Sequence, residues 1–226
     1  MDRSRFNPNH CIPHRSQPMK KNVCIYPKDQ TTDFLLPLYE HICNNMHAIG
    51  IHDDTTEENA LDRIYSEIHD AESVVFLGHG TSDWLCGSRF ENVIFEKEKC
   101  DLLCNKRLFL LACNSNQFIK KYDLHCAVGF GFLPTSLRDA RYVKKLHSMR
   151  IDNLQESDIE KYNTALVDAL INTLSSTTMA DFYLFKERLK FNISRRIVQV
   201  LLQRETPNYR LVADALYYVY KDVISS

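Results

Sequence analysis

Short apolar runs alternate with amphipathic stretches over the first 135 residues of the chain. Residues 32–44 and 55–68 place apolar side chains three and four positions apart, as amphipathic helices do. Thr55 and Glu58 have the spacing of a capping box at the start of the second helix. Five runs have the length and composition of buried strands: residues 22–26, 48–52, 73–77, 107–112 and 127–132. This alternation predicts an α/β domain in which helices flank a mostly parallel central sheet.

The rest of the chain follows two other patterns. Residues 83–104 mix polar and apolar positions, which is typical of a small hairpin or a loop-rich excursion. After residue 136 the period is helical: Ser157 and Glu160 have capping-box spacing, and residues 182–203 and 209–223 carry apolar stripes. The sequence therefore predicts a helical C-terminal third.

The N-terminal residues 1–21 are expected to form a flexible arm. Pro8, Pro13 and Pro18 interrupt any helical period there, and few large apolar side chains could anchor the segment. We expect one domain over residues 22–226, with an α/β core at 22–135 and a helical part at 136–226.

Charge and hydropathy limit the partners of the chain. Its 226 residues include 28 basic and 29 acidic side chains, well mixed, and a domain that binds nucleic acid would normally cluster its basic residues. The longest apolar stretches, such as residues 108–112, are too short to span a membrane. We expect no direct contact with nucleic acid and no membrane partner.

The first residues are polar and lack the apolar segment of a secretion signal. Without export, the eight cysteines are best interpreted as reduced thiols, most of them small buried residues. A cytoplasmic protein is the expectation.

Two short motifs suggest chemistry because each follows an apolar run directly. His79 lies between Gly78 and Gly80 after the run 73–77, and Cys113 follows the run 107–112. The carboxyl ends of parallel strands meet at one edge of a sheet, so the two side chains are expected to lie close together. A cysteine nucleophile needs a nearby imidazole and backbone donors for an oxyanion. The amides of Gly80 and Cys113 are candidate oxyanion donors.

The order of these motifs, His79-Gly80 and then Ala112-Cys113 about thirty residues later, resembles the caspase-like (clan CD) cysteine peptidases. The segment LLACNS is particularly similar to the CHAT branch of this family. The resemblance covers roughly residues 22–132. It implies a caspase-like α/β sandwich, a catalytic dyad of His79 and Cys113, and cleavage directly after one charged side chain of a protein substrate.

The charged residues near the strand ends could select that substrate side chain. Asp83 or Asp123 would favour Arg or Lys, whereas Arg138 would favour Asp. A basic preference is the commoner one on the CHAT side of the family, so we expect cleavage after Arg or Lys, with Asp83 as the selecting residue. Trp84 could line the same pocket or cap the core.

The resemblance also implies regulation. We expect a latent enzyme that a partner protein, a cleavage or a ligand activates by ordering the loops in residues 81–106. A bacterial defence or cell-death pathway would be a suitable setting. The alternative is a catalytically inactive scaffold or binding module on the same fold.

Other constellations are weaker. Cys100 and Cys104 could complete a zinc site with Cys86, His125 or Cys126, but paired C-x2-C motifs are missing. His125 and Cys126 could rival the proposed dyad, although neighbours on a strand point to opposite faces. No glycine-rich phosphate loop of standard spacing occurs, and we expect neither a metal nor another cofactor.

Overall fold

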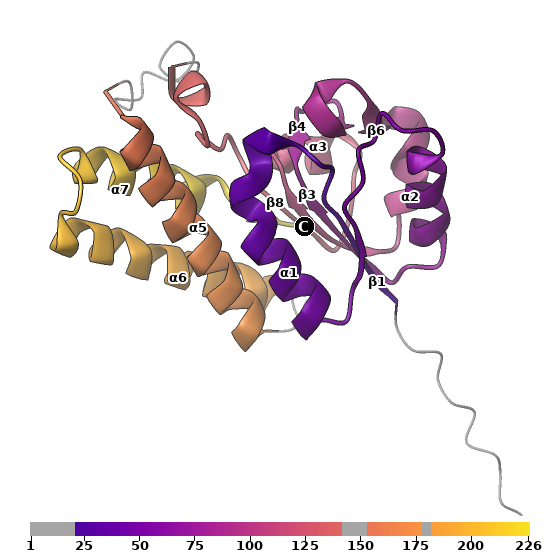
Figure 1. The fold of residues 1–226 in the computed structure, drawn as a ribbon. Coiled ribbons are helices and arrows are strands. Elements are labelled where there is room, and N and C mark those ends of the chain that lie inside the picture. Colours follow the sequence, from indigo (N-terminus) through magenta and orange to yellow (C-terminus); the bar gives the residue numbers. More distant parts are fainter. Residues whose placement is uncertain (1–20, 142–152, 178–181) are drawn as a thin grey trace, which may run out of the picture.

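The structure is a computed structural model that describes residues 21–141, 153–177 and 182–226. One central sheet organises this part of the protein. Within these residues the sheet has six strands in the order β2-β1-β3-β7-β8-β9 (Figure 1). All neighbours are parallel except β9, which runs antiparallel to β8. The strands are β1 (Asn22–Ile25), β2 (Ile49–Ile51), β3 (Ser73–Leu77), β7 (Arg107–Leu111), β8 (Ala127–Gly129) and β9 (Ile224–Ser225). The prediction of a mostly parallel sheet flanked by helices is confirmed.

Both faces of the sheet are buried, which explains the nearly continuous apolar runs in the sequence. Alternate strand residues belong to two separate cores: Val75 and Phe109 face one, while Val74 and Leu108 face the other. All four side chains are buried. The period of two along a strand therefore divides each run between two helical layers.

The first layer contains four helices, and Figure 1 shows three of them, α5 to α7, gathered on one side of the sheet. They are α1 (Leu36–Asn45), α5 (Glu156–Ser176), α6 (Phe182–Gln203) and α7 (Tyr209–Asp222). The expected helix over 32–44 is divided, because the 3-10 helix η1 (Gln30–Leu35) precedes α1. Pro37 lies at the start of α1, where the missing amide hydrogen costs no hydrogen bond.

The second layer covers the opposite face with two α-helices and a 3-10 helix. These are α2 (Ala60–His69), α3 (Ser115–Lys121) and the 3-10 helix η3 (Lys97–Leu103). Helix α3 starts two residues after Cys113, in a stretch where no helix was predicted.

Both capping-box predictions are wrong. The Thr55 hydroxyl accepts a hydrogen bond from the distant Ser88 amide at 2.7 Å, and α2 begins only after Asn59. Helix α5 is capped by Gln155 and Asp158, two residues before the predicted pair. Spacing alone could not separate the real cap from its neighbours.

Residues 79–95 form a small antiparallel sheet, in agreement with the expected hairpin or loop-rich excursion. Its strands are β4 (His79–Gly80), β5 (Leu85–Cys86) and β6 (Val93–Phe95), and the 3-10 turn η2 (Ser88–Phe90) joins the last two. Because β4 follows β3 after a single residue, this small sheet starts at the carboxyl edge of the main one.

The C-terminal part is helical, as predicted, and shares the first core with the main sheet. Its last strand, β9, pairs with β8 and extends that sheet. Residues 1–20 of the predicted arm lie outside the described residues. Among the described helices, none combines the length and hydropathy that a membrane crossing requires.

Ser115 joins three segments of the core and gives a test of the fold. Its hydroxyl donates to the Leu110 carbonyl at 2.6 Å and accepts from the Phe130 amide at 2.9 Å, in fully buried surroundings. We expect Ser115→Ala to lower the free energy of unfolding by about 1–3 kcal/mol, because the Phe130 amide loses its acceptor. Denaturant unfolding measures the change. Ser175→Ala, which removes an exposed hydroxyl, is the control; equal stability of the two variants would contradict this account.

Candidate active site

His79 and Cys113 occupy equivalent positions at the carboxyl edge of the sheet. Each lies two residues beyond the last residue of its strand, β3 or β7. The two strands are parallel neighbours with Leu77 opposite Leu111, and the Gly78 amide continues the ladder to the Leu111 carbonyl at 3.1 Å. Strand pairing thus brings the two predicted residues to the same edge.

A tight turn follows Cys113. Asn114 has a φ of 58°, in the left-handed region that asparagine tolerates better than most residues, and α3 starts at the next position. The Asn114 amide is held by the Gly131 carbonyl at 3.0 Å. Cys113 therefore belongs to neither β7 nor α3 and lies in the turn between them.

Gly80 is needed for space and not for an unusual backbone conformation. None of the described glycines has a positive φ. A side chain at position 80 would meet the Ala112 Cβ at 3.0 Å and the Cys113 carbonyl oxygen at 3.2 Å. Close packing of Gly80 on the Cys113 turn is the reason for the glycine.

His79 and Cys113 line one small cavity of about 20 Å³, which has room for about one water molecule. Gly78 and Leu111 from the strand ends line it as well. Its other walls come from η1, from the segment after β8 and from α5: Thr32, Phe34, Leu35, Leu133, Thr135 and Leu166. Both candidate catalytic side chains therefore face the same enclosed space.

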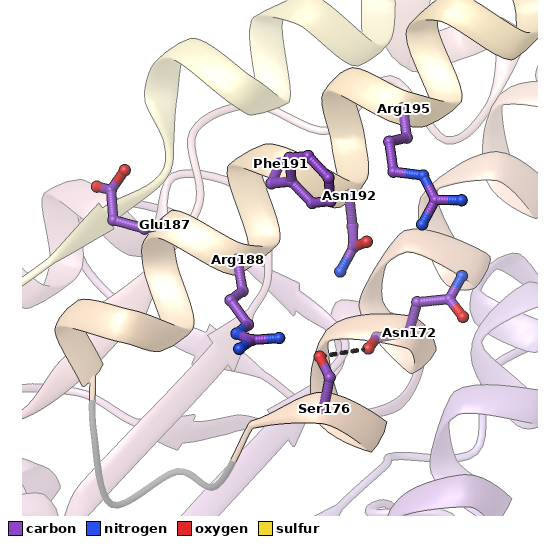
Figure 2. Close-up of a pocket in the computed structure, with 7 residues that line it drawn as sticks. All are labelled: Asn172, Ser176, Glu187, Arg188, Phe191, Asn192 and Arg195. Carbon is purple, nitrogen blue, oxygen red and sulfur yellow. Dashed lines mark hydrogen bonds between the residues drawn. The ribbon is translucent and has the colours of Figure 1, made fainter.

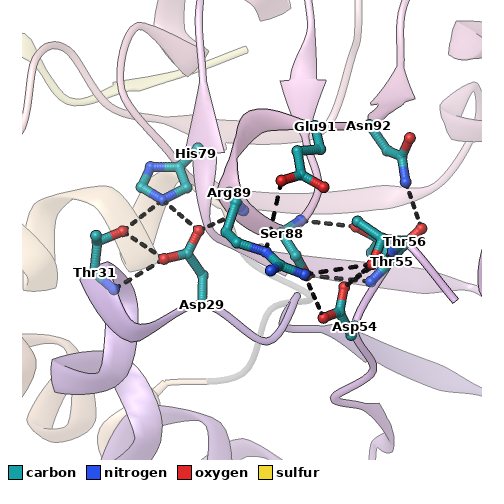
Figure 3. Close-up of polar contacts among 10 residues, drawn as sticks. All are labelled: Asp29, Thr31, Asp54, Thr55, Thr56, His79, Ser88, Arg89, Glu91 and Asn92. Atoms are coloured by element: carbon teal, nitrogen blue, oxygen red, sulfur yellow. Dashed lines mark hydrogen bonds and ion pairs between the residues drawn. The ribbon is translucent and has the colours of Figure 1, made fainter.

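An aspartate and a threonine orient the imidazole (Figure 3). Asp29 Oδ2 lies 3.3 Å from His79 Nε2, and Thr31 Oγ1 lies 2.9 Å from the same nitrogen. Thr31 donates its only hydroxyl hydrogen to Asp29 Oδ1 at 2.7 Å, so it can only accept from the ring. Two acceptors at Nε2 assign the hydrogen to that nitrogen and leave the lone pair of a neutral ring on Nδ1.

The loop that contains η2 covers the other side of this pair. The Arg89 amide donates to Asp29 Oδ2 at 2.6 Å, and the Phe90 ring stacks on the imidazole with centroids 4.0 Å apart. Both residues have positive φ values, 55° and 61°, which is uncommon for such side chains. The Arg89 guanidinium also binds Asp54 at 2.7 Å, which fixes the loop to the segment after β2.

Burial and charge act in opposite directions on this pair. Burial lowers the pKa of His79 below its ordinary value, although the charges of Asp29 and Asp139 favour the protonated ring. For Asp29, burial would raise the pKa, but hydrogen bonds from Thr31 and Arg89 and the nearby His79 bring it below the usual range. A neutral imidazole beside an ionised carboxylate is the resting arrangement near neutral pH.

The Cys113 thiol is neutral in the same arrangement. Its sulfur donates to the Leu133 carbonyl at 3.6 Å and accepts from the Leu133 amide at 3.5 Å. Burial raises the pKa of this thiol to about 12, with a smaller contribution from the charge of Asp139. The Cys113 thiol is therefore protonated near neutral pH.

Two further polar groups lie beside the cavity. Asp139 accepts hydrogen bonds at Oδ2 from Ser136 at 2.7 Å and from the cavity residue Thr135 at 3.3 Å. The Tyr162 hydroxyl is fully buried and has no hydrogen-bond partner among the described residues. Burial raises its pKa well above the usual value, and the nearby Cys113 and Asp139 add to the effect.

The structure does not bring the predicted pocket residues to this cavity. Asp83 is ion-paired with Lys121 at the surface, and the Asp123 side chain is 92% exposed. Trp84 and Arg138 are also exposed, and none of the four lines the cavity. The candidate oxyanion donors are better placed, because no described acceptor is paired with the Cys113 amide and Gly80 packs on the same turn.

The alternative constellations are dispersed. Cys100 is buried while Cys104 is exposed, and in the described part of the chain no three His, Cys, Asp or Glu side chains are arranged to hold a metal ion. His125 and Cys126 precede β8, at the amino edge of the sheet, and both are exposed. They lie at the opposite end of the strands from Cys113.

Comparisons with known proteins leave the family undetermined. No protein-family model, no curated protein and no solved structure matches this chain. The likeness to caspase-like peptidases therefore rests on the two sequence motifs alone.

Sequence reasoning missed the orienting residue. Asp29 followed by Thr31 is typical of a capped turn, and Asp29 does cap η1. That local signal could have singled out Asp29 as structural. Its contact with His79 depends on the order of strands β1 and β3 and is not visible in a local pattern.

Asp29→Asn is expected to lower the pKa of His79 further, because the carboxylate charge that favours the protonated ring is lost. A titration of the His79 ring by NMR measures the change. Asp54→Asn is the matched control, since Asp54 binds Arg89 and does not touch the imidazole. An unchanged or raised His79 pKa in Asp29→Asn would contradict the assigned contact.

Iodoacetamide at pH 7.5 is expected to modify the exposed Cys104 and Cys126 well before Cys113, which is partly enclosed and protonated. The rate at Cys113 should rise about tenfold per pH unit below its pKa. Peptide mass spectrometry over time gives the rate at each site. Modification of Cys113 first, or at the same rate as Cys104, would contradict the closed arrangement.

Proposed function

We propose that the chain is a caspase-like cysteine endopeptidase with Cys113 as the nucleophile and His79 as its proton carrier. The observation that supports this best is the shared cavity: two chemically complementary residues line it at the ends of adjacent parallel strands, and a carboxylate orients the imidazole. A histidine between an acceptor and a nucleophile is the arrangement that nucleophilic catalysis requires.

In the proposed reaction, His79 Nδ1 takes the proton of the Cys113 thiol while the sulfur attacks a peptide carbonyl carbon. The amides of Gly80 and Cys113 stabilise the resulting oxyanion. The imidazolium then gives its proton to the departing amine, and an acyl-enzyme remains for water to hydrolyse. Asp29 keeps the ring in the Nε2–H form and stabilises its positive charge during these steps.

The proposed enzyme is latent in this arrangement. The cavity holds about one water molecule, so a peptide backbone cannot reach the sulfur without movement of its walls. The expected loops at residues 81–106 already form the small sheet and two 3-10 helices. We therefore assign latency to the closed cavity, with Leu133 on the thiol, instead of to unordered loops.

We assign the preference for Arg or Lys to Asp139. Its Oδ2 atom is held by Thr135, a wall of the cavity, and its charge acts on both His79 and Cys113. Asp83 is neutralised by Lys121. A carboxylate beside an opened cavity would favour a basic substrate side chain.

An inactive scaffold is the second candidate function, and the raised Cys113 pKa favours it if the cavity never opens. A protein substrate, an activating partner and a role in bacterial defence or cell death belong to the first candidate by resemblance.

Substrate profiling of a protein library by mass spectrometry tests the proposal. We expect slow new cleavages after Arg or Lys with the parent protein, because the cavity must open before a peptide can reach the sulfur. Cys113→Ala should reduce that rate at least about a thousandfold, because the nucleophile is absent. Asp139→Asn should reduce the preference for basic residues, while Asp83→Asn should leave it unchanged.

A second readout separates a latent enzyme from an inactive one. A peptide that carries an electrophile after an arginine should label Cys113 in the parent protein. It should label Cys113 more slowly in Asp29→Asn. The peptidase proposal is wrong if neither cleavage nor labelling depends on Cys113.

A further inference from the structure

Helix α6 has a second face that the core does not use. Exposed apolar side chains recur on it at intervals of seven and four residues: Leu184, Phe191, Val198 and Leu202, with 41%, 62%, 53% and 75% of their surface exposed. Arg188 and Arg195 lie between them at the same spacing and are exposed. These six residues, called here the α6 stripe, form a heptad-like row along one side of the helix.

The stripe is distinct from the buried face of the same helix. Phe185, Leu189 and Ile193 are at most 1% exposed and belong to the first core. One residue of an α-helix turns the side chain by about 100°, so the row that contains Leu184 and Phe191 points about a quarter-turn or more away from the core row. A row of exposed apolar side chains along one helix face is a candidate contact surface.

A hollow of about 500 Å³ runs beside the stripe, between α6 and the end of α5 (Figure 2). Arg188 and Arg195 extend into it on either side of Asn192, opposite Asn172 and Ser176. Its lining thus combines an exposed aromatic ring, Phe191, with hydrogen-bond donors. It is far larger than the cavity at Cys113.

The hollow has an excess of positive charge. In the described part of the chain, no carboxylate is ion-paired with Arg188 or Arg195. Asp168 on α5 is engaged by Arg196 at 3.1 Å, and Figure 2 shows Glu187 pointing away from the two arginines. Glu187 is the one carboxylate among the described residues that lines the hollow, so the two arginines leave a net positive charge that a negatively charged ligand would complement.

We propose that the α6 stripe and its hollow bind an acidic amphipathic helix of a partner protein. Leucine-like side chains of that helix would cover Phe191, Val198 and Leu202, and two carboxylates seven residues apart would meet Arg188 and Arg195. Seven residues of a helix span about 10.5 Å, the same rise that separates the two arginines. The inference does not depend on whether Cys113 is a nucleophile.

Charge disfavours the other occupants. Residues 1–20 and 142–152 of this chain both contain more basic than acidic side chains, so neither complements the arginines. A second copy would bring two more arginines to the contact and no carboxylate from the stripe. An acidic amphipathic partner would both neutralise the charge of the two arginines and cover the apolar side chains of the stripe.

The test uses an 18-residue synthetic helix with two glutamates seven residues apart between leucines, and a twin in which both glutamates are lysines. We expect the acidic peptide to bind the full chain with a dissociation constant in the micromolar range, by calorimetry, and the lysine twin to bind at least about tenfold more weakly. Arg188→Glu with Arg195→Glu should reverse this order.

Phe191→Ala should weaken binding of the acidic peptide at least about tenfold. Ile49→Ala, which shortens a 40% exposed side chain on β2, should leave the binding unchanged. Circular dichroism confirms that the variants fold. The proposal is overturned if the two peptides bind alike or not at all. A concentration-dependent dimer in sedimentation that Phe191→Asp abolishes would identify a second copy as the occupant and overturn it too.

Discussion

The parallel pairing of β3 with β7 is the constraint on which the candidate site depends. Its register sets Leu77 against Leu111, and each partner of the candidate dyad follows two residues later. Both faces of these strands are buried. A shift of the strand register by one residue would therefore move every side chain of the strand into the opposite core. Packing along the whole strand therefore determines which two residues meet at its end.

The elements around that strand end hold the site shut. Leu133 engages the sulfur with both its amide and its carbonyl, and Leu166 of α5 closes the cavity from the helical layer. The pKa of the thiol, about 12 instead of 9.0, expresses this enclosure as roughly 4 kcal/mol against ionisation. A substrate or partner that binds the open arrangement more tightly than the closed one would favour opening and remove this enclosure.

The sequence predicted the features that depend on strand periodicity and order. Apolar runs identified the five parallel strands, and their abrupt ends at Gly78 and Cys113 identified the edge where the candidate residues meet. The short antiparallel β9 was not expected, because two residues carry no period. Helix starts were misplaced because Thr55 and Ser157 share their spacing with many uncapped pairs.

Contacts between distant loops were beyond local reasoning. Asp29 reaches His79 because η1 lies over the edge of β3, and Arg89 reaches Asp29 because the small sheet folds back toward that edge. Asp83 was singled out by its distance along the chain from His79, but Lys121 of α3 engages it in space. Charge near a motif in sequence is thus a poor guide to charge near a site.

One helix connects the two regions of this protein that carry a functional inference. Leu166 in the middle of α5 lines the cavity at Cys113, and Asn172 and Ser176 nearer its end line the hollow beside α6. A rigid helix that contributes to both could transmit a displacement between them, but physical contact alone does not couple two sites. Coupling requires that a ligand in the hollow have different affinities for the open and closed cavities, and its magnitude equals that difference. A partner that binds both arrangements equally would leave the thiol enclosed, however tightly it bound.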